Sequence, residues 1–251
     1  MKRRIKISAV ISLILTIVFI IGIIYSGIKI IEWKMNTNKN KEIQEEISEN
    51  IQVIEPEVPE EEPKYIVDFD ALKQQNSDTV AYLKVDSTDV DYVVVKGDNN
   101  DYYLNHNFKK EYNVAGWIFA DYKNKFDGTD KNIVIYGHNM QDGSMFASLK
   151  EILTSAWHEN EKQKITLVTE KNTITYEIIS SYSIEPEEYY ITTDFNSMEF
   201  SEFLTTITKR SYYDYHANIN TSDKILTLST CTGNGKNRIV IHAKQISLEE
   251  N

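Results

Sequence analysis

The pattern of hydrophobic and polar positions divides the chain into three parts. Residues 7–28 form an apolar run of 22 residues without a charge. At a rise of about 1.5 Å per residue, a helix of this length spans a hydrocarbon core of roughly 30 Å. The pattern predicts a transmembrane anchor over residues 7–31, an acidic stalk over residues 32–63, and a folded extracellular domain over residues 64–251.

The basic residues before the apolar run set the expected orientation. Lys2, Arg3, Arg4 and Lys6 lie in the first six residues, and positive charges favour the cytoplasmic side of a membrane. We therefore expect residues 1–6 to be cytoplasmic and the single-pass chain to place its C-terminal domain outside the cell. The alternative is a cleaved signal peptide, but the apolar run is longer than is usual for one and is not followed by a small-residue cleavage site.

The second part is polar and acidic. Residues 36–63 hold nine Glu and three of the four Pro residues of the chain. This composition predicts a short helix around Glu42–Ile51, followed by an extended and solvated stretch. We interpret the whole segment as a stalk or linker.

The third part is rich in short apolar runs bounded by Asp, Asn and Gly, a pattern typical of β-strands. Three helical patterns interrupt them, at residues 69–80, 144–159 and 196–212. The expected fold is mostly β with helical insertions, a β-barrel or a sandwich. The eight predicted strands are residues 81–85, 90–96, 116–120, 132–136, 164–168, 173–183, 224–230 and 238–246.

Charge and cysteine content restrict the chemistry. The net charge is −11 at pH 7, which argues against nucleic acid as the main partner because phosphate binding requires a basic surface. A single cysteine, Cys231, permits neither an internal disulfide nor a cysteine-rich zinc site. No phosphate-binding loop or EF-hand loop is present, and we expect no metal or organic cofactor, although an acidic domain leaves calcium open.

Cys231 ends a predicted strand and precedes a polar, Gly-containing loop, where catalytic groups are common. Side chains alternate along a strand, so Ser229 shares a face with Cys231. Arg238 opens the next strand, where a guanidinium could stabilise a thiolate or an oxyanion. The alternatives are an inert small apolar cysteine and a surface arginine paired with an acid.

A nucleophilic cysteine also needs a proton donor and acceptor. His138 follows an apolar strand and Gly137, which suits a displayed catalytic group. His242 is the rival because it shares a strand face with Arg238, but a histidine in mid-strand is more often a packing residue. His138 is therefore the preferred candidate.

Taken together, Thr227-Leu228-Ser229-Thr230-Cys231, Tyr136-Gly137-His138-Asn139 upstream and Arg238 downstream resemble the sortase transpeptidases of Gram-positive bacteria, in particular class B. The resemblance implies an eight-stranded barrel with a groove that ends at the cysteine. It implies Cys231 as nucleophile, His138 as general acid and base, and Arg238 as oxyanion stabiliser. The implied substrate-binding residues are Asn100, Tyr136, Tyr190, Ile191 and Ser229.

The resemblance also implies a reaction and its partners. Such an enzyme cleaves a C-terminal sorting signal, similar to NPQTN or a variant ending in Thr-Gly, on secreted proteins. It then joins them through a thioester to an amine of a peptidoglycan precursor at the cell membrane. The loop between Cys231 and Arg238 is short for class B. Two alternatives remain, a membrane-tethered cysteine protease that releases its product to water and a non-enzymatic tethered binding domain.

Overall fold

A computed structural model describes residues 7–56, 63–160, 164–232 and 235–251. The predicted cytoplasmic segment 1–6 and most of the Pro-spaced end of the stalk, residues 57–62, lie outside the described residues. The chain divides into two compact units, Met1–Glu42 and Ile43–Asn251. Each unit is considered by itself.

The first helix is longer than the predicted anchor. Helix α1 runs over Ile7–Ser48 and contains an 18-residue window with mean hydropathy 2.6, long and apolar enough to cross a membrane. It continues through the first half of the predicted stalk, where we expected only a short separate helix at Glu42–Ile51. The reason is local, because Lys, Glu and Gln are good helix formers and neither Gly nor Pro occurs between Ile28 and Pro56.

The folded unit begins before the predicted boundary at residue 64. Ile43 and Ile47 in the last turns of α1 are buried in the main hydrophobic core. Strand β1 (Ile51–Ile54) then pairs antiparallel with strand β2 (Lys64–Val67) in a small separate sheet. Part of the segment predicted to be a solvated linker is therefore a structural element of the folded unit.

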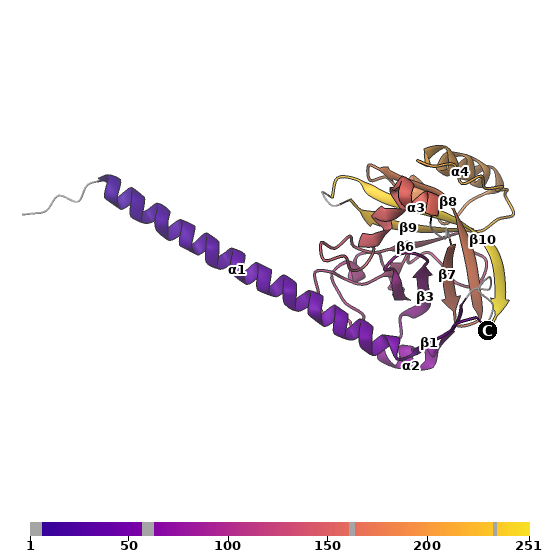
Figure 1. The fold of residues 1–251 in the computed structure, drawn as a ribbon, viewed down its shortest axis with the longest axis horizontal. Helices are drawn as coiled ribbons and strands as arrows, with labels where there is room; N and C mark the ends of the chain where they lie inside the picture. The colour runs from indigo at the N-terminus through magenta and orange to yellow at the C-terminus, as the bar shows by residue number, and fades with distance from the viewer. Residues whose placement is uncertain (1–6, 57–62, 161–163, 233–234) are drawn as a thin grey trace, which may run out of the picture. The chain divides into compact units, whose positions relative to one another are not determined.

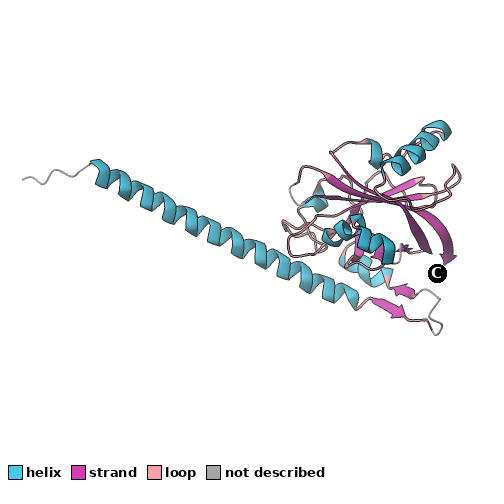
Figure 2. Cartoon of the chain, turned by 45° about the horizontal axis from the view of Figure 1, so that its top comes forward, coloured by secondary structure: helices cyan, strands magenta, loops and turns pink. Residues whose placement is uncertain are grey.

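Eight further strands close into a barrel, as predicted (Figure 1). Figure 2 shows these strands with the short helices at the margin of the barrel. The order around the barrel is β10-β8-β7-β3-β4-β5-β6-β9. The bounds are β3 Thr79–Val85, β4 Asp91–Val95, β5 Phe119–Ala120, β6 Asn132–Tyr136, β7 Lys164–Thr169, β8 Asn172–Ile184, β9 Ile225–Cys231 and β10 Arg238–Glu250.

Two neighbouring pairs in the barrel are parallel, β4 with β5 and β6 with β9, and the others are antiparallel. Parallel neighbours need a crossover connection rather than a hairpin. The segments between β4 and β5 and between β6 and β9 supply it, and these same segments carry some of the residues that surround the site described below. The connections hold the short 3₁₀ helices η1 (Tyr102–Leu104), η2 (Ala147–Leu153) and η3 (Tyr189–Ile191).

Two of the three predicted helices differ from the structure. Helix α2 (Phe69–Gln75) starts at the predicted residue, with Asp68 as its N-cap, but it ends at Asn76 because Thr79 already begins β3. The helix predicted at residues 144–159 is instead η2 followed by α3 (Ser155–Asn160). Helix α4 (Ser197–Arg210) agrees with its prediction, and an Asn196–Glu199 capping box fixes its start.

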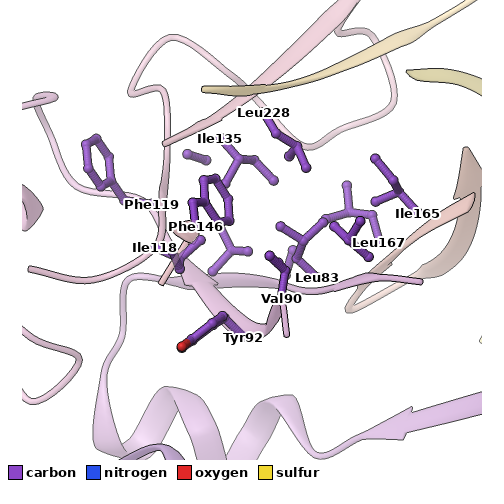
Figure 3. Close-up of a cluster of buried hydrophobic side chains, with 14 of the residues drawn as sticks. Leu83, Val90, Tyr92, Ile118, Phe119, Ile135, Phe146, Ile165, Leu167 and Leu228 are labelled. Atoms are coloured by element: carbon purple, nitrogen blue, oxygen red, sulfur yellow. The ribbon is translucent and has the colours of Figure 1, made fainter. Parts of the chain in front are cut away.

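The barrel interior is filled by aliphatic and aromatic side chains (Figure 3). Leu83, Ile135, Leu167 and Leu228 come from four different strands and are fully buried. Phe146, from the segment between β6 and η2, packs into the same cluster. This core fixes the strands whose ends carry the site.

The histidine that rivalled His138 lies in the core. His242 is fully buried, and Tyr182 donates a hydrogen bond of 2.9 Å to its Nε2. Its Nδ1 donates to Thr227 Oγ1 at 2.9 Å, because the Thr227 hydroxyl donates its own proton to Asn132 Oδ1 at 2.7 Å. In this arrangement the ring is a neutral imidazole, with Nδ1 as the donor and Nε2 as the acceptor. Burial, with a smaller contribution from nearby Arg210, lowers the pKa of His242 to about 3.

This burial predicts a pH dependence of stability. His242 stays neutral in the folded protein, whereas in the unfolded chain it takes up a proton near pH 6.5. The free energy of unfolding should therefore fall as pH drops from about 6.5 toward 3, by at most about 1.4 kcal/mol per pH unit from this group. Urea unfolding of wild type and of His242→Gln between pH 7 and pH 4 measures the difference. Parallel stability curves for the two proteins would contradict the expectation.

Candidate functional site

The site is built where two parallel strands end together. Strands β6 and β9 pair in register, with Tyr136 opposite Ser229. Gly137 N donates to Ser229 O at 3.3 Å and continues the ladder. His138 and Cys231 each lie two residues further along, and side chains two residues apart point to the same face of a strand. The two predicted catalytic residues therefore leave the sheet side by side, although they are far apart along the chain.

The imidazole of His138 is oriented by the main chain. His138 Nε2 lies 2.8 Å from the carbonyl oxygen of Leu104. A carbonyl oxygen only accepts hydrogen bonds, so Nε2 carries a proton. In the neutral ring Nδ1 is then the basic nitrogen, free to exchange a proton with a reacting group. Sequence analysis missed this partner because a backbone carbonyl has no signature in the sequence.

The segments around His138 and Cys231 are tied together. Asn139 Nδ2 donates to the carbonyl oxygen of Cys231 at 2.8 Å, and Phe146 N donates to His138 O at 2.9 Å. The sequence gives Asn139 no predicted role beyond its place in the Tyr136-Gly137-His138-Asn139 motif, and its position next to His138 was the only signal for one. These hydrogen bonds hold the backbone at His138 and at Cys231 in place.

Arg238 faces Cys231 across the β9–β10 hairpin. The two residues are direct partners in the antiparallel ladder, and side chains at such positions are close neighbours. Among the described residues, the hydrogen bonds of the Arg238 guanidinium are long, at 3.4 Å to Gly235 O and 3.5 Å to Asn237 O. No carboxylate among the described residues forms an ion pair with it. The alternative of an arginine engaged by a surface acid therefore does not hold for the described chain.

All eight residues that the sequence analysis singled out line one cavity of about 410 Å³. Its lining is Asn100, Tyr136, His138, Tyr190, Ile191, Ser229, Cys231 and Arg238, together with Leu104, Phe119, Gly137, Pro186, Glu187, Glu188 and Thr230. Cys231 itself is half-buried. A ligand in this cavity would meet an apolar surface with a few polar groups, which is typical of peptide and small-molecule sites.

One wall of the cavity comes from the chain between β8 and α4. Tyr190 in η3 is buried and its hydroxyl lies 3.3 Å from Ser229 Oγ. Burial raises the pKa of Tyr190 above its ordinary value, so the phenol is neutral. Glu187 in the same segment forms an ion pair with Arg210 in the last turn of α4. This ion pair connects the wall to a helix that packs on the barrel.

Among the described residues, no group of three or more His, Cys, Asp or Glu side chains is placed to hold a metal ion. At the cavity, Cys231, His138 and Arg238 offer a thiol, an imidazole and a guanidinium. Such a set suits nucleophilic attack on a carbonyl group with proton transfer and oxyanion stabilisation.

The packing at Gly137 gives a test of the site geometry. A Cβ at Gly137 would lie 2.4 Å from Ile118 Cδ1 and 2.9 Å from Phe146 Cγ. We expect Gly137→Ala to lower the free energy of unfolding by about 1–3 kcal/mol and to displace His138. Gly97→Ala is the matched control, because its Cβ would make an ordinary contact of 3.5 Å with Tyr103. Equal denaturant midpoints for the two variants would contradict this account.

Comparison with known proteins agrees with the geometry. Residues 83–246 match the family model of the Sortase domain. The sortase B of Listeria monocytogenes is 37% identical over 182 residues, covering 70% of this chain and 73% of that protein. The sortase B of Staphylococcus aureus is 28% identical over 239 residues, covering 94% of this chain and 96% of that protein.

Solved structures give the same result. A structure of Clostridium perfringens sortase B matches with a TM-score of 0.68 and 37% identity, covering 71% of this chain and 99% of that chain. A structure of sortase B from Bacillus anthracis in complex with AAEK1 matches with a TM-score of 0.73 and 34% identity, covering 85% of this chain and 99% of that one. The expected family and the expected barrel are both confirmed.

Proposed function

This chain belongs to the sortase family of cysteine transpeptidases, and we propose that it cleaves a C-terminal sorting signal and transfers the secreted protein to a peptidoglycan amine. The observation that carries the proposal is the meeting of Cys231, His138 and Arg238 at one cavity. The expected signal is similar to NPQTN or to a variant ending in Thr-Gly. The sorting signal would lie as an extended peptide in that cavity.

The first step is attack by the Cys231 thiolate. Its Sγ forms a bond to the carbonyl carbon of the substrate Thr, and the carbonyl oxygen becomes a tetrahedral oxyanion. Arg238 is opposite Cys231 in the ladder and has no competing carboxylate among the described residues, so its guanidinium can donate to that oxygen. Donors aimed at developing charge in a partly dry site are worth more than the same donors in water.

The second step is departure of the amine. His138 in its charged form holds Leu104 O through Nε2–H and donates its Nδ1 proton to the leaving nitrogen as the C–N bond breaks. The products are a thioester at Cys231 and a free amine. The incoming amine then attacks the thioester, His138 Nδ1 accepts its proton, and Cys231 leaves as a thiolate.

The polar and apolar lining would bind the signal. Tyr190 and Ile191 supply apolar surface from η3, and Ser229 lies on the floor two residues before Cys231. Asn100 and Tyr136, which come earlier in the chain, supply polar groups. These five residues are the proposed substrate-binding set.

The apolar part of α1 is proposed to be the membrane anchor. Its hydropathy and length support a membrane span, and the basic residues in the first six positions support a cytoplasmic N-terminus. In that orientation the barrel faces the cell wall, where the amine acceptor is found. A cleaved signal sequence is the alternative, and the mass of the mature protein distinguishes the two.

The decisive variant for the proposed reaction is Cys231→Ala. We expect wild-type protein mixed with a sorting-signal peptide to gain the mass of the acylating fragment, and the variant to gain none, because the chain has no other cysteine. Intact-protein mass spectrometry measures this adduct. Continued peptide cleavage by a folded Cys231→Ala variant would rule out the thioester route.

Product analysis separates transfer from hydrolysis. With an added amine, a transpeptidase gives a product that contains the amine, whereas a tethered protease gives only the free acid. The non-enzymatic alternative predicts neither product and no acylation of Cys231.

A second prediction concerns Arg238. Arg238→Met should lower kcat about 100- to 1,000-fold, the usual loss for an oxyanion donor, with a smaller change in KM. Steady-state kinetics on one signal peptide measures both constants. Lys236→Met, a charge removal in the same hairpin, is the control. Equal losses in both variants would point to general charge rather than to the oxyanion.

A further inference from the structure

A buried carboxylate stands behind the cavity. Asp121 directly follows β5 and is 3% exposed. Its carboxylate accepts three hydrogen bonds, from Lys123 N at 2.9 Å, from Asn100 Nδ2 at 2.8 Å and from Tyr136 Oη at 2.8 Å. Among the described residues no cation lies within ion-pairing distance of it. The three hydrogen bonds help to offset the cost of burying this carboxylate.

The two carboxylate oxygens have different partners. Oδ1 accepts from Lys123 N, two residues along, which is the hydrogen bond of an Asx turn. Oδ2 accepts from both Asn100 and Tyr136, which line the cavity. An asparagine would form the same turn, so the turn does not explain why a carboxylate, with a second acceptor oxygen, stands at position 121.

Oδ2 fixes the direction of both cavity groups. Asn100 cannot flip its amide, because its Oδ1 accepts from Tyr122 N at 3.1 Å while its Nδ2 donates to Asp121. Tyr136 must use its hydroxyl proton on Asp121, which leaves only lone pairs on its oxygen. Burial and the Asp121 charge raise the pKa of Tyr136 above its ordinary value, so the phenol keeps that proton.

We propose that Asp121 is a positioning residue that sets the hydrogen-bonding polarity of the cavity wall, with Asn100 presenting an N–H donor and Tyr136 an oxygen acceptor to one amide group of the bound peptide. The inference rests on the proposed function, because it takes a peptide as the ligand. A neighbouring donor and acceptor match an amide, which offers one C=O and one N–H. Asp121 itself touches neither the peptide nor the reacting atoms.

Asp121→Asn tests the proposal with almost no change of shape. The new amide keeps Oδ1 for Lys123 but turns an N–H toward Asn100 and Tyr136. Two amide donors then face each other, and Tyr136 becomes an acceptor whose own proton points away from residue 121. We expect KM for a sorting-signal peptide to rise about tenfold or more, with kcat changed less than threefold and with alkylation of Cys231 unchanged.

The matched control is Asp130→Asn in the same β5–β6 connection. Asp130 accepts from Lys125 N, Phe126 N and Asn124 Nδ2 and does not line the cavity. The Asp130→Asn variant should be less stable than wild type, while its KM stays at the wild-type value. Equal changes of KM in the two variants would overturn the proposal, because a disturbed turn would then account for both.

A double-mutant cycle of Asp121 and Tyr136 adds a test, because a residue that only stabilises the fold would not change the effect of Tyr136→Phe on KM. Tyr136→Phe should cost less in KM on the Asp121→Asn background than on wild type, because the phenol no longer presents its acceptor there. Additive effects would overturn the proposal. So would a fall in kcat at constant KM, which would place the carboxylate in the chemistry.

An exchange of the two side chains covers the case in which a single variant is poorly folded. Asn100→Asp alone places two carboxylates together, and Asp121→Asn alone places two amides together. The double variant restores one donor facing one acceptor, with Tyr122 N and Lys123 N still bonded. Its melting temperature should exceed that of both single variants, while KM stays raised because position 100 now offers only acceptors.

A double variant no more stable than the single ones would overturn the assigned contact. These melts need no substrate, so they also separate the two proposals. A wild-type domain that processes no signal peptide counts against the proposed function. The exchange result still decides whether Asp121 orients residue 100.

Discussion

The site depends on one constraint, the parallel and in-register pairing of β6 with β9. A parallel pair has its carboxyl ends at the same edge, so residues at equal distance beyond Tyr136 and Ser229 must be neighbours. A shift of one residue in either strand would turn His138 or Cys231 to the opposite face. The barrel core, with Ile135 and Leu228 as direct partners, opposes such a shift because it would expose buried side chains. Hydrophobic packing thus sets the position of reactive groups that it does not touch.

The groups that orient the site come largely from the main chain and from residues behind the cavity. The Leu104 carbonyl sets the protonated nitrogen of His138, the Cys231 carbonyl is held by Asn139, and the missing side chain at Gly137 makes room for Ile118 and Phe146. The crossover segments between parallel strands bring these groups together.

The sequence predicted most of the barrel strands and eight of the residues that line the cavity. Strand β6 was predicted with its observed ends because Asn132 and Gly137 bound a continuous apolar run. The split between η2 and α3 was missed because helical spacing alone does not separate a 3₁₀ turn from an α-helix. Strands β1 and β2 were missed because each has four residues and is defined only by its partner. Asp121 was not singled out from the sequence, because its hydrogen bond with Asn100 depends on the pairing of β4 with β5.

The burial of Ile43 and Ile47 has a mechanical consequence. These residues lie in the last two turns of α1 and belong to the main core, so the helix ends by packing into the folded unit rather than in a slack linker. A pull along the apolar end of α1 would reach the core side chains before it reached the chain from residue 49 onward. Hydrophobic packing of Ile43 and Ile47 would thus resist a force applied along this helix.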